Sequence, residues 1–117
     1  MSIYRFDAYE YGSCDSRYIQ CFDLIFQNIA QRHFDVLVQG YQGENRFVLG
    51  LYHLDPAPQP GSIAQLPTAY NHNQPFTLYI HTNLTTPYPL TMTMYAKNEG
   101  ALIAAFTHNE LTVIDPL

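Results

Sequence analysis

Charged residues are scarce in this sequence. Asp, Glu, Lys and Arg make up 13% of its 117 residues, against roughly 25% in an average soluble domain. Only five residues are Lys or Arg, they are scattered singly, and the formal net charge is -5. A protein that binds nucleic acid usually carries a basic surface that displaces counterions from the phosphates. The sequence therefore predicts that nucleic acid is not a partner.

Cysteine is also rare. Cys14 and Cys21 are the only two cysteines, and their spacing is not the C-x-x-C of zinc or thioredoxin-like sites. Two cysteines are too few for the disulfide framework of a small secreted scaffold. A bond between them would close a very short loop, which makes its geometry demanding. We therefore expect two reduced thiols.

Targeting signals are missing from the sequence as given. Residues 1–7 lack the continuous apolar stretch and small-residue cleavage site of a secretory signal. No later run approaches the ~18 apolar residues of a membrane span. These absences predict a protein of the cytoplasm that has no membrane partner.

Apolar residues, in contrast, are abundant. Hydrophobic residues make up 47% of the chain and aromatic residues 15%, which is enough apolar surface to offset the entropy lost on folding. The chain is shorter than the roughly 150 residues that are typical of one domain. We therefore expect residues 1–117 to form a single domain with one core.

One segment has the spacing of an amphipathic helix. Between residues 18 and 30, apolar side chains recur three or four positions apart and polar side chains occupy the opposite arc. Leu24 falls among the polar positions, and Asp15 or Ser16 could cap the N-terminus. The pattern predicts a helix over about residues 16–32. Its apolar stripe would consist of Tyr18, Cys21, Phe22, Ile25, Phe26 and Ile29.

The rest of the chain is rich in strand signals. Residues 34–41 and 46–54 are β-prone runs on either side of a short polar loop at residues 42–45, which predicts a hairpin. Apolar and polar residues alternate in residues 76–84 and again in residues 90–97. This alternation predicts two strands that each bury one face.

Further strand signals lie at the two ends of the sequence. Residues 101–107 are apolar on both faces, which predicts a central strand, and residues 111–114 and 3–9 suit a last and a first strand. The order is one strand, one helix and then an antiparallel β-meander. We therefore predict an α+β fold in which the helix packs on the meander sheet. The alternative is an all-β sandwich.

Polar side chains that suit recognition project from the late strands. Residues 77–83 and 91–97, which we expect to be neighbours in the sheet, carry hydroxyls, an imidazole and aromatic rings. These groups can bind a sugar or a partner surface, although any half-exposed antiparallel sheet shows Thr and Tyr to water. The loop at residues 70–74 has similar chemistry, on residue types that recognition loops favour and that also form ordinary turns. The predicted binding residues are Tyr79, His81, Thr93 and Tyr95 on the sheet and Tyr70, Asn71 and His72 in the loop.

No group of residues has the local pattern of a catalytic or metal site. The carboxylates are spread singly, so none is paired at the separation that acid–base chemistry needs. Cys14 could be a nucleophile with His81 or His108 as its base, but no local signature supports this. His53 and Asp55 could share a metal ion, yet Asp55 precedes a proline and suits a turn. We expect no catalytic residue, no cofactor and no metal.

Composition favours a binding function. Low charge with many Tyr and Thr residues is typical of a surface buried against another polypeptide, because interface cores are poor in charge and rich in aromatics. We predict a non-catalytic interaction or assembly domain. It would be a homo-oligomer in contact through Tyr79, Thr93 and Tyr95, or a small acidic inhibitor or immunity-type binder of a cognate protein. The alternative is a carbohydrate-binding, lectin-like module that uses the Tyr, Thr and His sheet face or the loop at residues 70–74.

Overall fold

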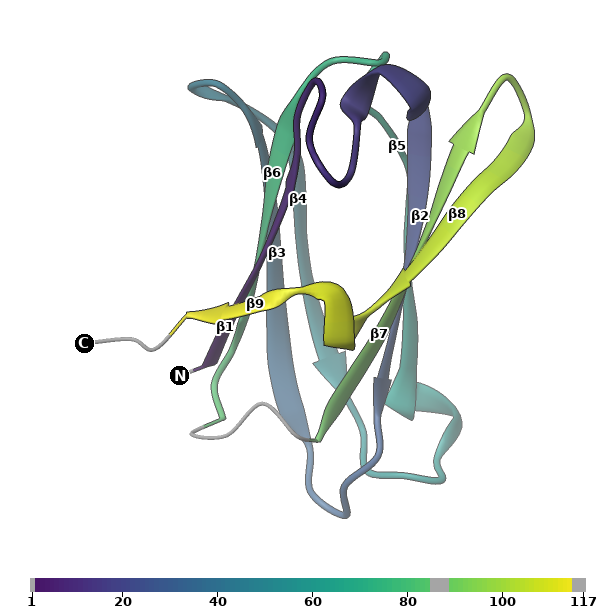
Figure 1. The fold of residues 1–117 in the computed structure, drawn as a ribbon. Coiled ribbons are helices and arrows are strands. Elements are labelled where there is room, and N and C mark those ends of the chain that lie inside the picture. The colour runs from purple at the N-terminus through teal and green to yellow at the C-terminus, as the bar shows by residue number, and fades with distance from the viewer. Residues whose placement is uncertain (1, 85–88, 115–117) are drawn as a thin grey trace.

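Two antiparallel sheets packed face to face make up the fold (Figure 1). The computed structural model describes residues 2–84 and 89–114, which form nine strands. The five-stranded sheet has the order β4 (Asn45–Leu54), β3 (Phe34–Gln42), β6 (Phe76–Thr82), β1 (Ser2–Ala8) and β9 (Thr112–Ile114). The four-stranded sheet has the order β5 (Ile63–Tyr70), β2 (Cys21–Asn28), β7 (Leu90–Asn98) and β8 (Ala101–Thr107).

The predicted α+β fold is wrong, and the all-β sandwich is the architecture observed. Helical structure in the described ranges is limited to three 3₁₀ turns of three residues each: η1 (Ser16–Tyr18), η2 (Pro60–Ser62) and η3 (His108–Glu110). The segment predicted as a helix over residues 16–32 contains η1 and the strand β2 instead. None of the described helices is long and apolar enough to cross a membrane.

The pattern that imitated a helix is that of a strand with apolar residues on both faces. Phe22, Leu24 and Phe26 of β2 are buried in the core between the sheets. Cys21 and Ile25 are apolar too, but they lie on the outer face, because side chains alternate along a strand. With these two residues, the apolar positions in the sequence no longer alternate with polar ones. They instead recur three or four residues apart, as in an amphipathic helix. Leu24, which the helical pattern left on the polar side, is a core residue.

Strand pairing also differs from the predicted meander. β6 pairs with β1 and β3, whereas β7 pairs with β2 and β8, so the two late strands belong to different sheets. β8, predicted as a central strand, lies at the edge of the four-stranded sheet and exposes Leu102 and Ile103. The hairpin of β3 and β4 is confirmed, with Gly43 at a positive φ of 61° in its turn.

Aromatic rings join the two sheets in the core. Phe22 of β2 stacks on Phe76 of β6, with ring centroids 4.9 Å apart and planes 13° from parallel. Phe6 of β1 contacts Phe106 of β8 at 5.3 Å. Such pairs contribute about 0.5–1.5 kcal/mol beyond the area that they bury. These contacts hold the two sheets in position relative to each other. The strands that carry the outward-pointing side chains are therefore held in position as well.

Candidate functional site

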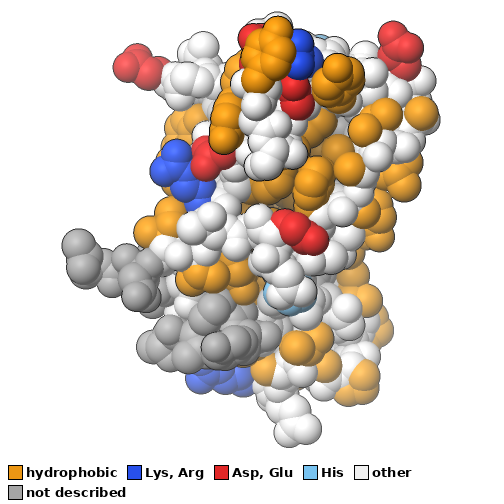
Figure 2. Space-filling view, viewed as in Figure 1, with side chains coloured by type: hydrophobic (Ala, Val, Ile, Leu, Met, Phe, Trp, Pro, Cys, Tyr) orange, Lys and Arg blue, Asp and Glu red, His pale blue; other side chains and the backbone are white. Residues whose placement is uncertain are grey.

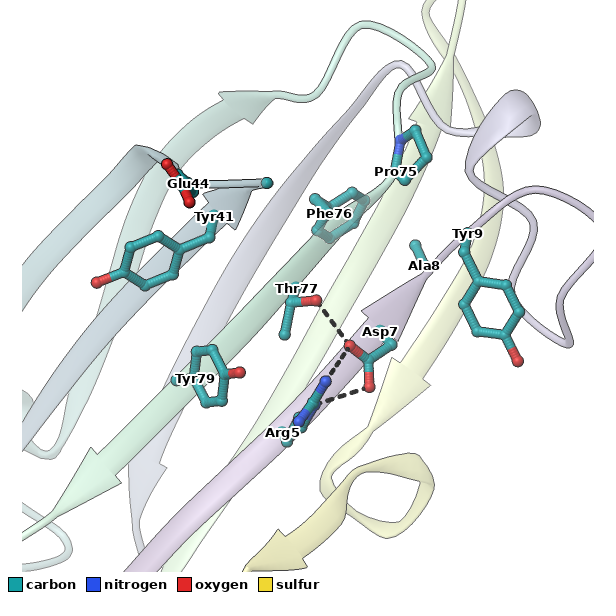
Figure 3. Close-up of a pocket in the computed structure, with 11 residues that line it drawn as sticks. Arg5, Asp7, Ala8, Tyr9, Tyr41, Glu44, Pro75, Phe76, Thr77 and Tyr79 are labelled. Carbon is teal, nitrogen blue, oxygen red and sulfur yellow. Dashed lines mark hydrogen bonds and ion pairs between the residues drawn. The ribbon is translucent and has the colours of Figure 1, made fainter.

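A groove of about 800 Å³ lies on the outer face of the five-stranded sheet (Figure 3). β1, β3 and β6 contribute its floor, and the turn between β3 and β4 contributes part of its rim. The groove combines aromatic rings with charged and hydroxyl groups. We call it the sheet groove, and its defining residues are Arg5, Asp7, Tyr9, Tyr41, Thr77 and Tyr79.

Strand register places these side chains in two adjacent rows. In one row, Thr77 of β6 lies between Asp7 of β1 and Tyr41 of β3. In the next row, Tyr79 of β6 lies opposite Arg5 of β1. Because successive side chains point to opposite faces, all five project outward while the residues between them are buried. Segments that are far apart in sequence thus form one site.

An ion pair with an added hydroxyl occupies the centre of the sheet groove. Arg5 Nε donates to Asp7 Oδ2 at 2.9 Å, and Arg5 Nη2 donates to Asp7 Oδ1 at 3.3 Å (Figure 3). Thr77 Oγ1 donates to Asp7 Oδ1 at 2.7 Å. The hydrogen bond and the charge of Asp7 raise the pKa of Arg5, so the guanidinium stays charged. The two charged side chains are 43% and 38% exposed, and such an ion pair adds at most about 1 kcal/mol to stability.

Aromatic rings flank this polar centre on both sides. The rings of Tyr41 and Tyr79 meet edge to face, with centroids 6.1 Å apart and planes at 73°. Arg5 Cζ lies 5.5 Å from the centre of the Tyr79 ring, and the His81 ring lies 6.4 Å from it. Tyr9 projects on the other side of β1 and is half exposed (Figure 3). Tyr79 is therefore held in place by neighbours from three strands while it lines the groove.

The structure separates the four sheet residues predicted to bind. Tyr79 and His81 lie on the outer face of the five-stranded sheet, and His81 lies just beyond the sheet groove. Thr93 and Tyr95 lie on the outer face of the four-stranded sheet, because β7 belongs to that sheet. The two outer faces point away from each other (Figure 1). One flat contact through Tyr79, Thr93 and Tyr95 is therefore impossible.

The loop residues predicted to bind divide in a different way. The Asn71 side chain is buried, and its Nδ2 donates to the carbonyls of Ile19 at 2.7 Å and Gln74 at 3.1 Å. Tyr70 and His72 are exposed, and their rings stack 5.9 Å apart at 23°. Asn71 thus fastens the loop to the body of the protein, and only Tyr70 and His72 are accessible to a ligand.

Sequence reasoning missed Arg5, Asp7, Tyr9 and Tyr41 as site residues. Alternation within residues 3–9 places Arg5 and Asp7 on one face of a strand, and this signal was present in the sequence. The local sequence does not show which strand lies beside β1. Nothing in it indicates that β1 pairs with β6, from which Tyr79 projects. The site depends on that long-range pairing.

The cysteines and His53, which lie outside the sheet groove, are the other groups that could be reactive. Burial raises the pKa of the Cys14 thiol to about 11, so it is neutral near pH 7, and the helix that could have activated it is absent from the described chain. Cys21 is also a free thiol. His53 Nδ1 lies 2.7 Å from Asp35 Oδ1, and His53 Nε2 lies 3.6 Å from Asp55 Oδ1. Even so, no three His, Cys, Asp or Glu side chains among residues 2–84 and 89–114 are arranged to hold a metal ion.

The sheet groove offers a ligand three kinds of contact. Aromatic rings supply apolar faces, Asp7 supplies acceptors, and Arg5 supplies donors in a planar fork. A few fixed polar groups among apolar ones are typical of small-molecule sites. Comparisons of the chain with protein-family models, with curated proteins and with solved structures found no match.

Proposed function

We propose that this protein binds carbohydrate in the sheet groove. A pyranose ring has an apolar face of C–H groups, which packs on an aromatic ring, and a rim of hydroxyls that both donate and accept hydrogen bonds. The observation that carries the proposal is the position of the Tyr79 ring beside the Arg5 and Asp7 pair. One end of the contact is apolar and the other is polar, as a sugar requires.

The polar centre suits hydroxyl groups in particular. Asp7 is already oriented by Arg5 and Thr77, so a sugar hydroxyl could donate to its carboxylate without reorganising the site. A neighbouring hydroxyl could accept from the Arg5 guanidinium. Charge-assisted hydrogen bonds of this kind are roughly twice as strong as neutral ones. Because these charged groups are half exposed, a ligand must displace water from them, and this cost of desolvation keeps the expected affinity in the micromolar to millimolar range.

The test compares two tyrosines on opposite faces. Tyr79→Ala removes the proposed stacking ring, and Tyr95→Ala removes a tyrosine from the other outer face. In titrations with neutral oligosaccharides, Tyr79→Ala should weaken binding about tenfold or more, because one aromatic contact is worth about 0.5–1.5 kcal/mol beyond its buried area. Tyr95→Ala and Tyr79→Phe should bind as the parent does. Equal losses in the two alanine variants, or no binding by the parent, would overturn the proposal.

Self-association is the second candidate, and the edge strand β8 favours it. Residues 101–107 carry no charged side chain, and Leu102 and Ile103 are exposed. Figure 2 shows hydrophobic side chains along the side of the molecule where β8 lies. An uncharged edge strand can pair with the same strand of a second copy, because no like charges then meet. Light scattering should then give a dimer that Leu102→Lys dissociates, and a parent monomer at tens of micromolar would exclude it.

We also propose that the protein resides in the cytoplasm. Cys14 and Cys21 are both free thiols, and thiols stay reduced where glutathione and thioredoxin act. Alkylation after denaturation without a reductant, applied to protein from its native source, should label both cysteines. Protein in which neither is labelled would contradict the proposed location.

A further inference from the structure

The sheet groove continues past β1 into two further depressions. A depression of about 400 Å³ shares Arg5, Asp7 and Tyr9 with the sheet groove and reaches η3. A third, of about 280 Å³, shares Ser13 and Phe106 with the second and reaches β8. Because each depression shares lining residues with the next, the three adjoin one another in a series. We call this series the trough.

The trough is open because β9 covers only part of β1. β9 pairs with Ile3–Arg5, so Phe6–Ala8 have no partner strand on that side among the described residues. Figure 1 shows β9 crossing one end of β1, with the loop that leads to η1 facing the other end. A chain-like ligand could therefore pass from the sheet groove over β1 towards β8.

Tyr9 lies where the first two depressions meet, and its ring has a defined seat. The ring lies against the backbone of Gly12, where an added Cβ would be 2.5 Å from Tyr9 Cε2. Gly12 N also donates to the Tyr9 carbonyl at 3.1 Å. Any larger residue at position 12 would have to push the ring aside. The ring is half exposed, so its position leaves it available as a second stacking surface beyond Tyr79.

The charges along the trough are mainly negative. Arg5 is paired with Asp7, and Glu44 and Glu110 line the first and second depressions. Glu110 is held in place by Thr107, whose backbone N–H and hydroxyl both donate to Glu110 Oε2, at 2.6 Å and 2.7 Å. An anionic sugar such as a uronate would meet like charges, which disfavours binding.

From these observations we infer that the ligand is a linear, neutral oligosaccharide of several units that lies along the trough. Tyr79 would stack on one unit and Tyr9 on a unit further along, on the two sides of β1. This inference rests on the proposed carbohydrate binding and adds the length and charge of the ligand.

The test is a length series measured by calorimetry. The probes are cello-, xylo- and malto-oligosaccharides of two to six units, and oligogalacturonides of the same lengths. For a neutral series that binds, affinity should rise about tenfold or more from two units to six, since a second aromatic contact is added to the first. The oligogalacturonides should bind more weakly at every length.

Variants separate this inference from the function on which it rests. Tyr9→Ala and Gly12→Ala should lose most of the gain with length, whereas Tyr79→Ala should lose affinity at every length. If short and long ligands bind equally and Tyr9→Ala has no effect, the trough is overturned and the sheet groove stands. If the uronate series binds as well as the neutral one, the charge argument is overturned. Binding by none of the series overturns both proposals. Thermal unfolding of each variant shows whether it is folded.

Discussion

The two outer faces of the sandwich contain similar residues in different surroundings. The five-stranded sheet presents the Arg5–Asp7 pair with a threonine hydroxyl on the carboxylate. The four-stranded sheet presents an ion pair of Lys97 and Asp23 at 2.6 Å, and a threonine again donates to the carboxylate. The Asp23 side chain is only 11% exposed, against 38% for Asp7. The Asp7 carboxylate is open to a ligand, whereas the Asp23 carboxylate is enclosed by its own sheet.

That difference teaches that residue type alone does not mark a binding face. Tyr79 and Tyr95 both alternate with buried residues on their strands. Tyr79 lies over a groove because β1 and β3 flank β6 and carry Arg5 and Tyr41. Tyr95 lies opposite Asp23 and Ala105. The neighbouring strands, which come from distant parts of the chain, decide what each tyrosine can do.

The largest expected effect on the free energy of unfolding comes from the core between the two sheets. The effects of substitutions on either outer face can be compared with it. Phe22→Ala should lower the free energy of unfolding by about 3–5 kcal/mol, because it leaves a cavity between the sheets. Ile25→Ala, on the outer face of the same strand, should cost less than half as much. Urea unfolding measures both values. Equal costs would mean that the assigned faces of β2 are wrong.

The next prediction compares the two carboxylates directly. Asp23→Ala should cost about 2 kcal/mol of stability, because it leaves the Lys97 ammonium and the Thr68 hydroxyl without their shared acceptor. Asp7→Ala should cost less than about 1 kcal/mol, since an exposed ion pair stabilises little. Oligosaccharide binding should show the opposite order, lost in Asp7→Ala and retained in Asp23→Ala. The same order in both assays would erase the distinction between the faces.

A smaller effect should appear in the pH dependence of stability. Hydrogen bonds from Lys97 and Thr68 lower the pKa of Asp23. The unfolded carboxyl, with an ordinary pKa of about 3.9, therefore binds a proton before the folded one does. The contribution of Asp23 is complete above that value and is lost as pH falls through the lower pKa of the folded state. Acid titrations of stability should show a shallower decline for Asp23→Asn than for the parent, and parallel curves would contradict this assignment.

Local pattern in the sequence was enough for β6 and β7 themselves but not for the strands beside them. The alternation in residues 76–84 and 90–97 indicated the faces of β6 and β7 correctly, because period two depends only on the strand itself. It could not indicate that these strands lie in different sheets, since pairing depends on contacts across the whole chain. The same limit hid the groove, which needs β1 beside β6.

Two further features of the fold were predicted wrongly from the sequence: the edge position of β8 and the strand structure of β2. An apolar segment such as residues 101–107 has the composition of a central strand, and only the strand order shows that β8 is an edge. In β2, Cys21 and Ile25 lie on the outer face and give the spacing of a helix. Leu24 was the one residue that contradicted the helix, and its burial shows that it contained the decisive information.

The most direct test of the central claim is to map a bound neutral oligosaccharide by backbone amide chemical shifts. The outer face of the five-stranded sheet is predicted to respond, with the largest shifts at Asp7, Thr77 and Tyr79 and smaller ones at Tyr9. The amides of Thr93, Tyr95 and Lys97 should stay unchanged. Shifts centred on those three residues, or spread evenly over both faces, would contradict the assignment of the sheet groove as the binding site.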